Sequence, residues 1–192
     1  MKHQSRLFKI GLLFSVALLL AGWGRDPIKT VKSGTLAFDT SVTVGGALDG
    51  YRYFKETKWE TFEDEQGRTV VQFTGAIKLD AFEGVVDEAA GLTISKAMVE
   101  KAKSAEFGFQ MDYVCQFVIS KVDDKSFDIR YSGCNVRFLG MKEGGEPSPG
   151  AVSPDQEEKD EDLSFLKAIY ANKPAPAVEA NILLSGMRSA PQ

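Results

Sequence analysis

Carboxylates are the main side chains in this sequence with the chemistry for acid–base catalysis, because the single histidine, His3, lies near the N-terminus. Without histidine elsewhere, the chain has no Ser-His-Asp or Cys-His system and no imidazole zinc site. Paired carboxylates hydrolyse glycosidic bonds without histidine. The densest group before residue 140 is formed by Asp80, Glu83, Asp87 and Glu88. These residues are the candidates for a carboxylate hydrolase, although a chain with 27 acidic residues also contains such groups by chance.

Two cysteines, Cys115 and Cys134, are candidates for a disulfide. Apolar residues occupy every second position over 107–119, which predicts a strand, and a second alternating stretch follows the turn at 122–126. Its alternation slips by one residue at 132–133, which is typical of a β-bulge and brings Cys134 opposite Cys115. Facing β-carbons lie about 4.5 to 5.5 Å apart. We predict a Cys115–Cys134 disulfide, with two free core thiols as the alternative.

Aromatic and apolar side chains supply the candidates for partner binding, since such residues dominate interface energetics. Tyr53 falls off the apolar side of the helix predicted to begin at residue 43, so we predict an exposed ring with Phe54 beside it. Leu163, Leu166 and Tyr170 lie on an amphipathic helix predicted over 161–173. That helix either docks in a groove of a partner or folds back onto its own domain, and the sequence leaves both open.

The order of predicted elements favours an α+β domain over residues 30–141. A short helix begins after residue 43, strands at 59–63 and 68–77 form a hairpin, and a second helix begins near 95. The two alternating strands then form a second hairpin. We predict a two-layer fold in which an antiparallel sheet of two hairpins carries two helices on one face.

The composition changes after residue 141. Glycines and prolines followed by a block of acidic residues predict a disordered acidic linker over 142–160. The amphipathic helix over 161–173 is expected to end at the prolines at 174 and 176, because proline interrupts a helix. We predict a flexible tail over 174–192.

The first 24 residues have the features of an export signal. Lys2, Arg6 and Lys9 precede an apolar run over 10–21, which is too short to span a bilayer. We therefore predict a signal peptide over 1–24 and a protein that works in the periplasm or cell envelope of a bacterium. Cleavage after Gly24 gives a soluble domain. An uncleaved leader is the alternative, and only in that case do we expect the protein to contact a membrane.

The end of this leader, Leu20-Ala21-Gly22, resembles the first three positions of the lipobox of bacterial lipoproteins. In that family the next residue is a cysteine that carries diacylglycerol, whereas this chain has Trp23. The resemblance implies lipoprotein ancestry, but the Trp23 side chain has no thiol to be lipidated. The helix-then-hairpin order is also similar to that of small two-layer envelope lipoproteins, which include inhibitors and assembly factors. A shared fold does not imply a shared function.

The composition of the rest of the chain disfavours nucleic acid as a partner. The leader holds three of the 23 basic residues and no acidic residue, so removing it leaves a formal net charge of −7. This charge repels a phosphate backbone. Two cysteines without histidine do not make a structural zinc site. We expect no metal, no cofactor and no nucleic acid.

These observations favour an exported, non-enzymatic envelope protein that binds another protein or an envelope component. A first alternative is the carboxylate hydrolase, acting on envelope glycans, which requires the acidic group at 80–88 to converge in a cleft with one raised pKa. A second alternative is a carrier of a small apolar ligand, which requires the apolar face of residues 107–119 to line a cavity. This ranking of the three functions depends mainly on motifs that the sequence lacks.

Overall fold

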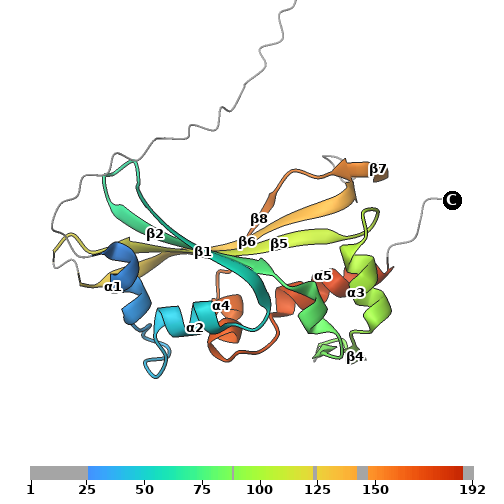
Figure 1. The fold of residues 1–192 in the computed structure, drawn as a ribbon, viewed down its shortest axis with the longest axis horizontal. Coiled ribbons are helices and arrows are strands. Elements are labelled where there is room, and N and C mark those ends of the chain that lie inside the picture. The colour runs from blue at the N-terminus through green and yellow to red at the C-terminus, as the bar shows by residue number, and fades with distance from the viewer. Residues whose placement is uncertain (1–25, 88, 123–124, 142–146, 188–192) are drawn as a thin grey trace, which may run out of the picture.

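The computed structural model describes residues 26–87, 89–122, 125–141 and 147–187, and the predicted leader with Trp23 lies outside them. The fold is α+β: a curved antiparallel sheet lies on a layer of helices (Figure 1). The helices are α1 (Pro27–Ser33), α2 (Val44–Gly50), α3 (Lys96–Lys103), α4 (Ser164–Tyr170) and α5 (Pro176–Met187), with the 3-10 turn η1 (Leu79–Phe82). The strands are β1 (Phe54–Glu63), β2 (Thr69–Ile77), β3 (Val86–Asp87), β4 (Leu92–Thr93), β5 (Phe109–Ile119), β6 (Phe127–Met141), β7 (Pro147–Val152) and β8 (Gln156–Lys159).

The main sheet has the strand order β1-β2-β5-β6-β7, and β8 pairs with a separate stretch of β6. All pairings in it are antiparallel, and β3 and β4 form a small separate ladder. The two predicted hairpins are β1–β2 and β5–β6. The predicted fold class is therefore confirmed, with more strands and helices than expected.

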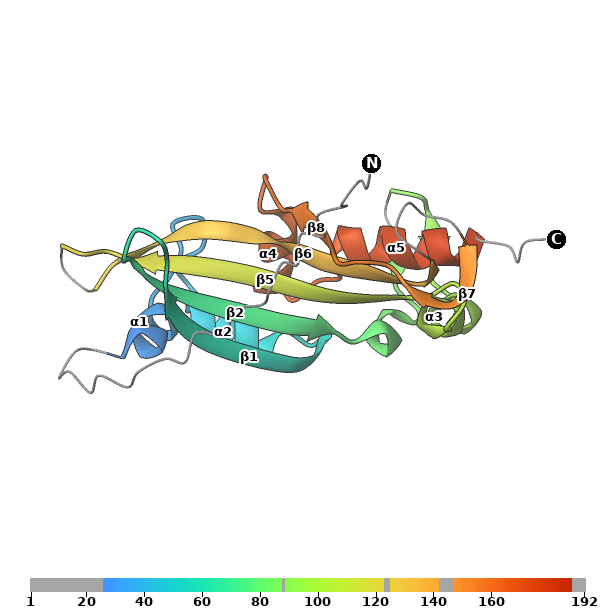
Figure 2. The same ribbon diagram turned by 90° about the horizontal axis from the view of Figure 1, so that it is seen from above.

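The core lies between one face of this sheet and the helices, and we call that face the inner face. Alternate residues of β5 supply its centre, as the apolar period predicts. All of them are buried: Phe109, Met111, Tyr113, Cys115, Phe117 and Ile119. The opposite, outer face carries no helix among the described residues (Figure 2).

The predicted disulfide is wrong, because the register of β5 on β6 differs from the expected one. Cys134 lies opposite Tyr113, and Cys115 lies opposite Ser132. The bulge is at Arg130, earlier in β6 than predicted. Both thiols are free and buried.

The alternation of polar and apolar residues in β6 predicted the wrong register, because two of its residues face the side opposite to the one that their polarity favours. Tyr131 faces outward although its ring is largely apolar, and the polar Ser132 faces the core. A buried hydroxyl is stable only when it is hydrogen-bonded. The Oγ of Ser132 lies 2.9 Å from the hydroxyl of Tyr113 and donates to Oδ2 of Asp160 at 3.0 Å.

The C-terminal third of the chain also differs from the predictions. Instead of a disordered linker over 142–160, residues 147–152 and 156–159 form β7 and β8 on the edge of β6. Instead of a flexible tail over 174–192, residues 176–187 form α5, whose Val178 and Ile182 are fully buried. Pro176 does not stop a helix here but begins one, because the first helical position needs no N–H. The folded domain therefore extends well past residue 141.

Asp160 connects the C-terminal helices to the sheet. Its carboxylate accepts hydrogen bonds from the backbone N–H groups of Phe165 and Leu166, both at 3.1 Å, at the start of α4. The same carboxylate accepts the hydroxyl of Ser132, which contacts Tyr113 inside the core. One side chain thus satisfies the start of a helix and a buried hydroxyl of β6 together.

Replacing Asp160 with alanine is expected to lower the free energy of unfolding by about 2 to 3 kcal/mol, because hydrogen bonds to a charged acceptor are lost and a buried hydroxyl loses its acceptor. Urea denaturation followed by circular dichroism measures the change. The matched control is Asp155→Ala, which breaks an exposed ion pair with Arg137 and should cost less than about 1 kcal/mol. Equal losses in the two variants would contradict the role of Asp160.

The cysteines give a second test of the register. Burial raises the pKa of the Cys115 thiol to about 12 and raises the pKa of the Cys134 thiol as well. We expect neither thiol to react with a maleimide at pH 8 in the native protein and both to react after denaturation without reductant. Intact mass after alkylation reads this out. Reaction that requires a reductant would instead show a disulfide.

Candidate binding site on the outer face of the sheet

The structure separates the carboxylates that the sequence offered for catalysis. Asp80 is exposed and forms an ion pair with Lys103 at 2.8 Å, and Glu83 is exposed as well. Asp87 is buried, and its Oδ1 accepts the backbone N–H three residues later at 2.5 Å, so it stabilises its own turn. Glu88 lies outside the described residues. The described members therefore do not form the expected catalytic group.

Tyr53 is not exposed as predicted, because only 2% of its surface is accessible. Its ring packs 4.7 Å from that of Phe82, and its hydroxyl accepts a hydrogen bond from Arg52 at 2.6 Å. Phe54 is half-buried over Gly75, where a β-carbon would come within 2.7 Å of the ring. Both aromatic residues serve the domain's own packing.

The helix predicted over 161–173 is present as α4, and it folds back onto its own domain. Leu166 is fully buried, while Leu163 and Tyr170 are half-buried. Phe165, which the sequence analysis did not single out, stacks on Tyr113 with ring centroids 4.7 Å apart. Its partner lies 52 positions earlier in the chain, so no local pattern indicated the contact. The apolar side of α4 is thus occupied within the domain.

The apolar face of 107–119 lies in the core rather than along a cavity. The helices cover it, and the buried side chains of α4 and α5 belong to the same continuous core. The hollow described below is on the other face of the same strand. Nothing in the described part of the chain therefore adds support for an apolar carrier.

The outer face has a different organisation, which follows from the register of four strands. Side chains that face each other across β2, β5, β6 and β8 form three parallel rows. The first row contains Gln72, Gln116 and Tyr131, the middle row contains Thr74, Val114 and Gly133, and the third row contains Asp112, Asn135 and Glu157.

The side chains of the middle row are small, so the larger side chains of the first and third rows form the walls of a hollow that we call the outer groove. Its volume is about 280 Å³. Eight residues line it: Gln72, Thr74, Asp112, Val114, Gln116, Tyr131, Asn135 and Glu157. At Gly133 a β-carbon would lie 2.6 Å from the carbonyl oxygen of Glu158 and would also meet the Tyr131 hydroxyl. Glycine is therefore needed for β8 and the tyrosine to approach the floor.

Two groups in the outer groove are partly withdrawn from water, as the shifts of their pKa show. Burial raises the pKa of the Asp112 carboxyl, and the nearby Arg137 and Lys55 only partly offset that rise. Burial likewise raises the pKa of the Tyr131 phenol, to which Glu157 contributes. The Tyr131 hydroxyl oxygen is buried beside the Glu157 carboxylate but makes no hydrogen bond of standard geometry with any described group. Such a group is costly to leave unsatisfied, so it favours a ligand that bonds to it.

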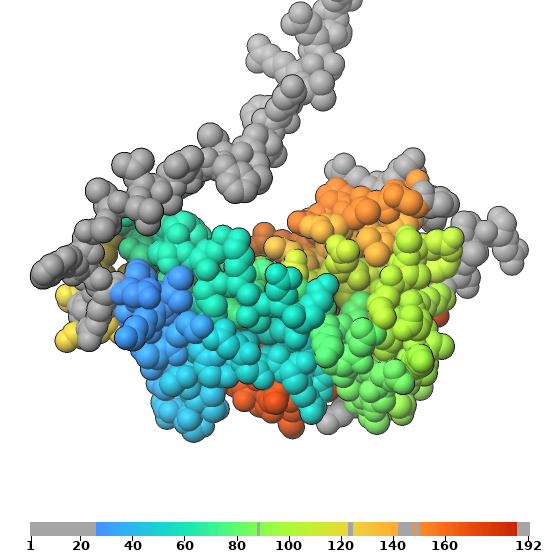
Figure 3. All heavy atoms as spheres, in the orientation of Figure 1, coloured from blue at the N-terminus to red at the C-terminus, as the bar shows by residue number. Residues whose placement is uncertain are grey.

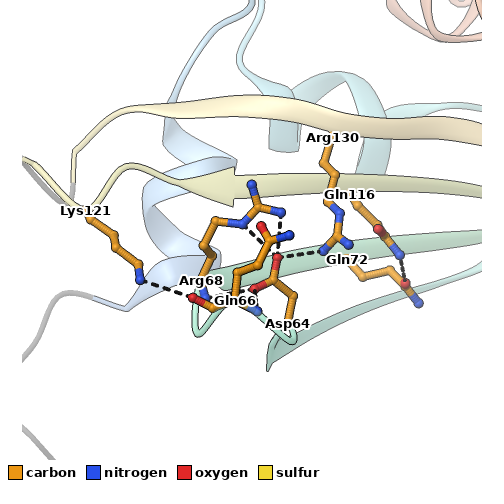
Figure 4. Close-up of polar contacts among 7 residues, drawn as sticks. All are labelled: Asp64, Gln66, Arg68, Gln72, Gln116, Lys121 and Arg130. Carbon is orange, nitrogen blue, oxygen red and sulfur yellow. Dashed lines mark hydrogen bonds and ion pairs between the residues drawn. The ribbon is translucent and has the colours of Figure 1, made fainter.

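A polar cluster at the end of the β1–β2 hairpin lies beside the first row (Figure 4). Gln116 donates from Nε2 to Oε1 of Gln72 at 2.8 Å. Beside this pair, the Asp64 carboxylate accepts Arg68 at 2.7 Å and Arg130 at 3.1 Å. Arg130 is the bulge residue of β6, and the bulge frees it from strand pairing. The bulge thus links the second hairpin to the turn of the first.

The side chains of the outer groove suit a neutral ligand rich in hydroxyl and amide groups. Amide side chains at 72, 116 and 135 both donate and accept, and the carboxylates at 112 and 157 accept only. All of these residues lie on strands, which hold polar groups at fixed spacings. The sequence did not indicate the site, because these residues occupy the polar positions that alternate with apolar core positions along each strand. Their convergence depends on registers that the pattern does not specify.

Comparison of the chain with protein-family models, curated proteins and solved structures gave no match. No described helix is both long enough and apolar enough to cross a membrane. Within the same described ranges, no three histidine, cysteine or acidic side chains come together as metal ligands.

The Asp64 cluster predicts a pH-dependent stability. Hydrogen bonds from Arg68 lower the pKa of Asp64 to about 2, below its ordinary value of 3.8. A lowered folded-state pKa stabilises the fold above the unfolded-state pKa, and that contribution disappears as the pH falls through the folded-state value. Asp64→Asn should therefore be less stable than the parent at pH 7, with a difference that shrinks between pH 4 and 2.

Urea denaturation of both proteins across this pH range checks that expectation. Glu65→Gln, in the same turn, is the matched control for removing one exposed charge. A stability difference between parent and Asp64→Asn that stays constant down to pH 2 would contradict the ion-pair cluster.

Proposed function

We propose that the protein is an exported, non-enzymatic binding module that holds a polar component of the cell envelope in the outer groove. The observation that carries this proposal is the Tyr131 hydroxyl, which is buried at the groove beside the Glu157 carboxylate and makes no hydrogen bond of standard geometry with any described group. Native proteins rarely retain such a group without a reason. A ligand group that bonds to this hydroxyl supplies one.

The ligand chemistry that fits best is that of a glycan strand. Sugar hydroxyls donate and accept at once, and so match the amides of Gln72, Gln116 and Asn135. The Asp112 carboxylate gains most from a hydroxyl donor, because burial has removed part of its hydration.

Rigid positioning supports a binding role. The groove is built on β2, β5 and β6, whose inner-face side chains form the core. A preorganised site loses little conformational entropy when the ligand binds. The site therefore gains affinity from side chains that the fold already holds in place.

A second candidate, a carboxylate hydrolase, is favoured by one observation. Asp112 has a raised pKa and shares the groove with a second carboxylate, Glu157. A glycoside hydrolase needs one carboxyl that stays protonated as general acid and a second that is ionised. This pair differs from the group at 80–88, and it would act on the same glycan class.

Titration of the purified protein with soluble fragments of bacterial cell-wall glycan, followed by calorimetry, tests the binding role. Tyr131→Phe should weaken binding about five- to tenfold, since one hydrogen bond is worth about 1 kcal/mol. Its stability without ligand should rise, by up to about 1 to 3 kcal/mol, because the change removes a buried hydroxyl that makes no hydrogen bond of standard geometry. Tyr170→Phe is the matched control, because that hydroxyl is also buried without a partner but lies outside the groove.

The same mixtures distinguish the two candidates. A binding module leaves the fragments intact, whereas a hydrolase releases new reducing ends that Asp112→Asn abolishes. Equal glycan affinity in the parent and in Tyr131→Phe, or no affinity in either, would overturn the proposed role of the groove.

A further inference from the structure

The edge of the main sheet offers a second surface, independent of the outer groove. β1 is the outermost strand, and within the described ranges it pairs only with β2. Figure 3 shows its turquoise segment in the middle of the molecular surface, between α1 and the green segment that follows β2. All of its side chains are exposed except those of Phe54 and Trp59, which are half-buried. An exposed edge of this length is a template for another strand.

The hydrogen bonds of the hairpin show which backbone groups of β1 are unpaired. The N–H of Asp64 donates to the carbonyl of Arg68 at 3.0 Å, so residue 64 points toward β2. In an antiparallel ladder, residues alternate between pointing toward one neighbour and toward the other. Residues 57, 59, 61 and 63 therefore direct their N–H and C=O groups outward. An added strand must align its own outward residues with these.

A second copy of β1 meets this requirement when it runs antiparallel about a two-fold axis through Trp59. Lys58 then faces Glu60 of the second copy across the interface. By symmetry this pair occurs twice, so two opposite-charge pairs lie across the interface. Thr57 faces Thr61 of the second copy, a pair that suits a sheet.

The charges also disfavour the neighbouring registers that the backbone permits. An axis through Lys58 places the two Lys58 side chains opposite each other and brings Glu56 opposite Glu60. An axis through Glu60 places the two Glu60 side chains opposite each other. Like charges directly opposite each other are destabilising. The register about Trp59 is therefore the one that the sequence of β1 favours.

We propose that the chain forms a two-fold dimer in which β1 pairs antiparallel with β1 of a second copy, with Trp59 at the axis. Within one chain, Lys58 already lies 2.7 Å from Glu60 on the outer face. In the dimer these two pairs form a square of alternating charges. The axis is perpendicular to the sheet, so the helices of both copies lie on one side and the two outer grooves lie on the other.

Sedimentation equilibrium of the purified protein over a range of concentrations tests the dimer, and the parent is expected to be dimeric. Lys58→Glu places like charges opposite each other and should raise the dimer dissociation constant at least tenfold. The double variant Lys58→Glu/Glu60→Lys exchanges the charges and should restore dimerisation. Lys96→Glu, an exposed site on α3, is the control for net charge, and circular dichroism checks the fold of each variant.

Cross-linking tests the register itself. Thr57→Cys and Thr61→Cys chains, mixed and oxidised, should form a disulfide between the two variants, because paired residues lie about 5.5 Å apart. Neither variant alone should cross-link, and the native cysteines are buried. A parent that stays monomeric at every concentration, equal weakening by Lys58→Glu and Lys96→Glu, or cross-linking of Thr57→Cys to itself would each overturn the proposal. None of these outcomes bears on glycan binding by the groove.

Discussion

The hydrogen-bond chain from Tyr113 through Ser132 to Asp160 is the interaction on which the rest of this structure depends. Its three side chains come from β5, β6 and the start of the C-terminal helices, and the bonds between them are 2.9 and 3.0 Å long. A buried hydroxyl without a partner costs roughly 1 to 3 kcal/mol. Ser132 can therefore face the core only because a phenol and a carboxylate meet it there. That orientation sets the register of the central hairpin.

The orientation of Ser132 determines both faces of the sheet, because neighbouring residues of a strand point to opposite sides. With Ser132 inward, Tyr131 and Gly133 face outward, and the tyrosine hydroxyl and β8 lie close against Gly133. The same register places Cys134 opposite Tyr113 and away from Cys115. The orientation of Ser132 thus also fixes the separation of the two thiols and the shape of the outer surface.

The two faces and the free edge of the sheet differ in the side chains that they present. The inner face holds the core, the outer face presents polar side chains on rigid strands, and the free edge at β1 presents alternating charges. The proposed ligand binding and the proposed dimerisation would not compete, because the groove lies on β2, β5, β6 and β8 while the proposed interface lies on β1. Two grooves on one side of a dimer would contact a repeating polymer at two points, and linked contacts raise the overall affinity.

The sequence alone determined the α+β class, the two hairpins, the apolar inner face of β5 and the approximate starts of two helices, where the structure shows Thr43 and Ser95 accepting backbone N–H groups. These features follow from local periods and local hydrogen bonds. The sequence did not determine the position of the bulge, the burial of Tyr53, the strands β7 and β8, the helix α5 or the outer groove. Those depend on contacts between distant residues, such as Ser132 with Asp160, 28 positions apart. Periodicity reports which residues share a face, whereas only tertiary contacts decide which faces meet, because a polar residue is stable inside wherever the fold brings it a partner.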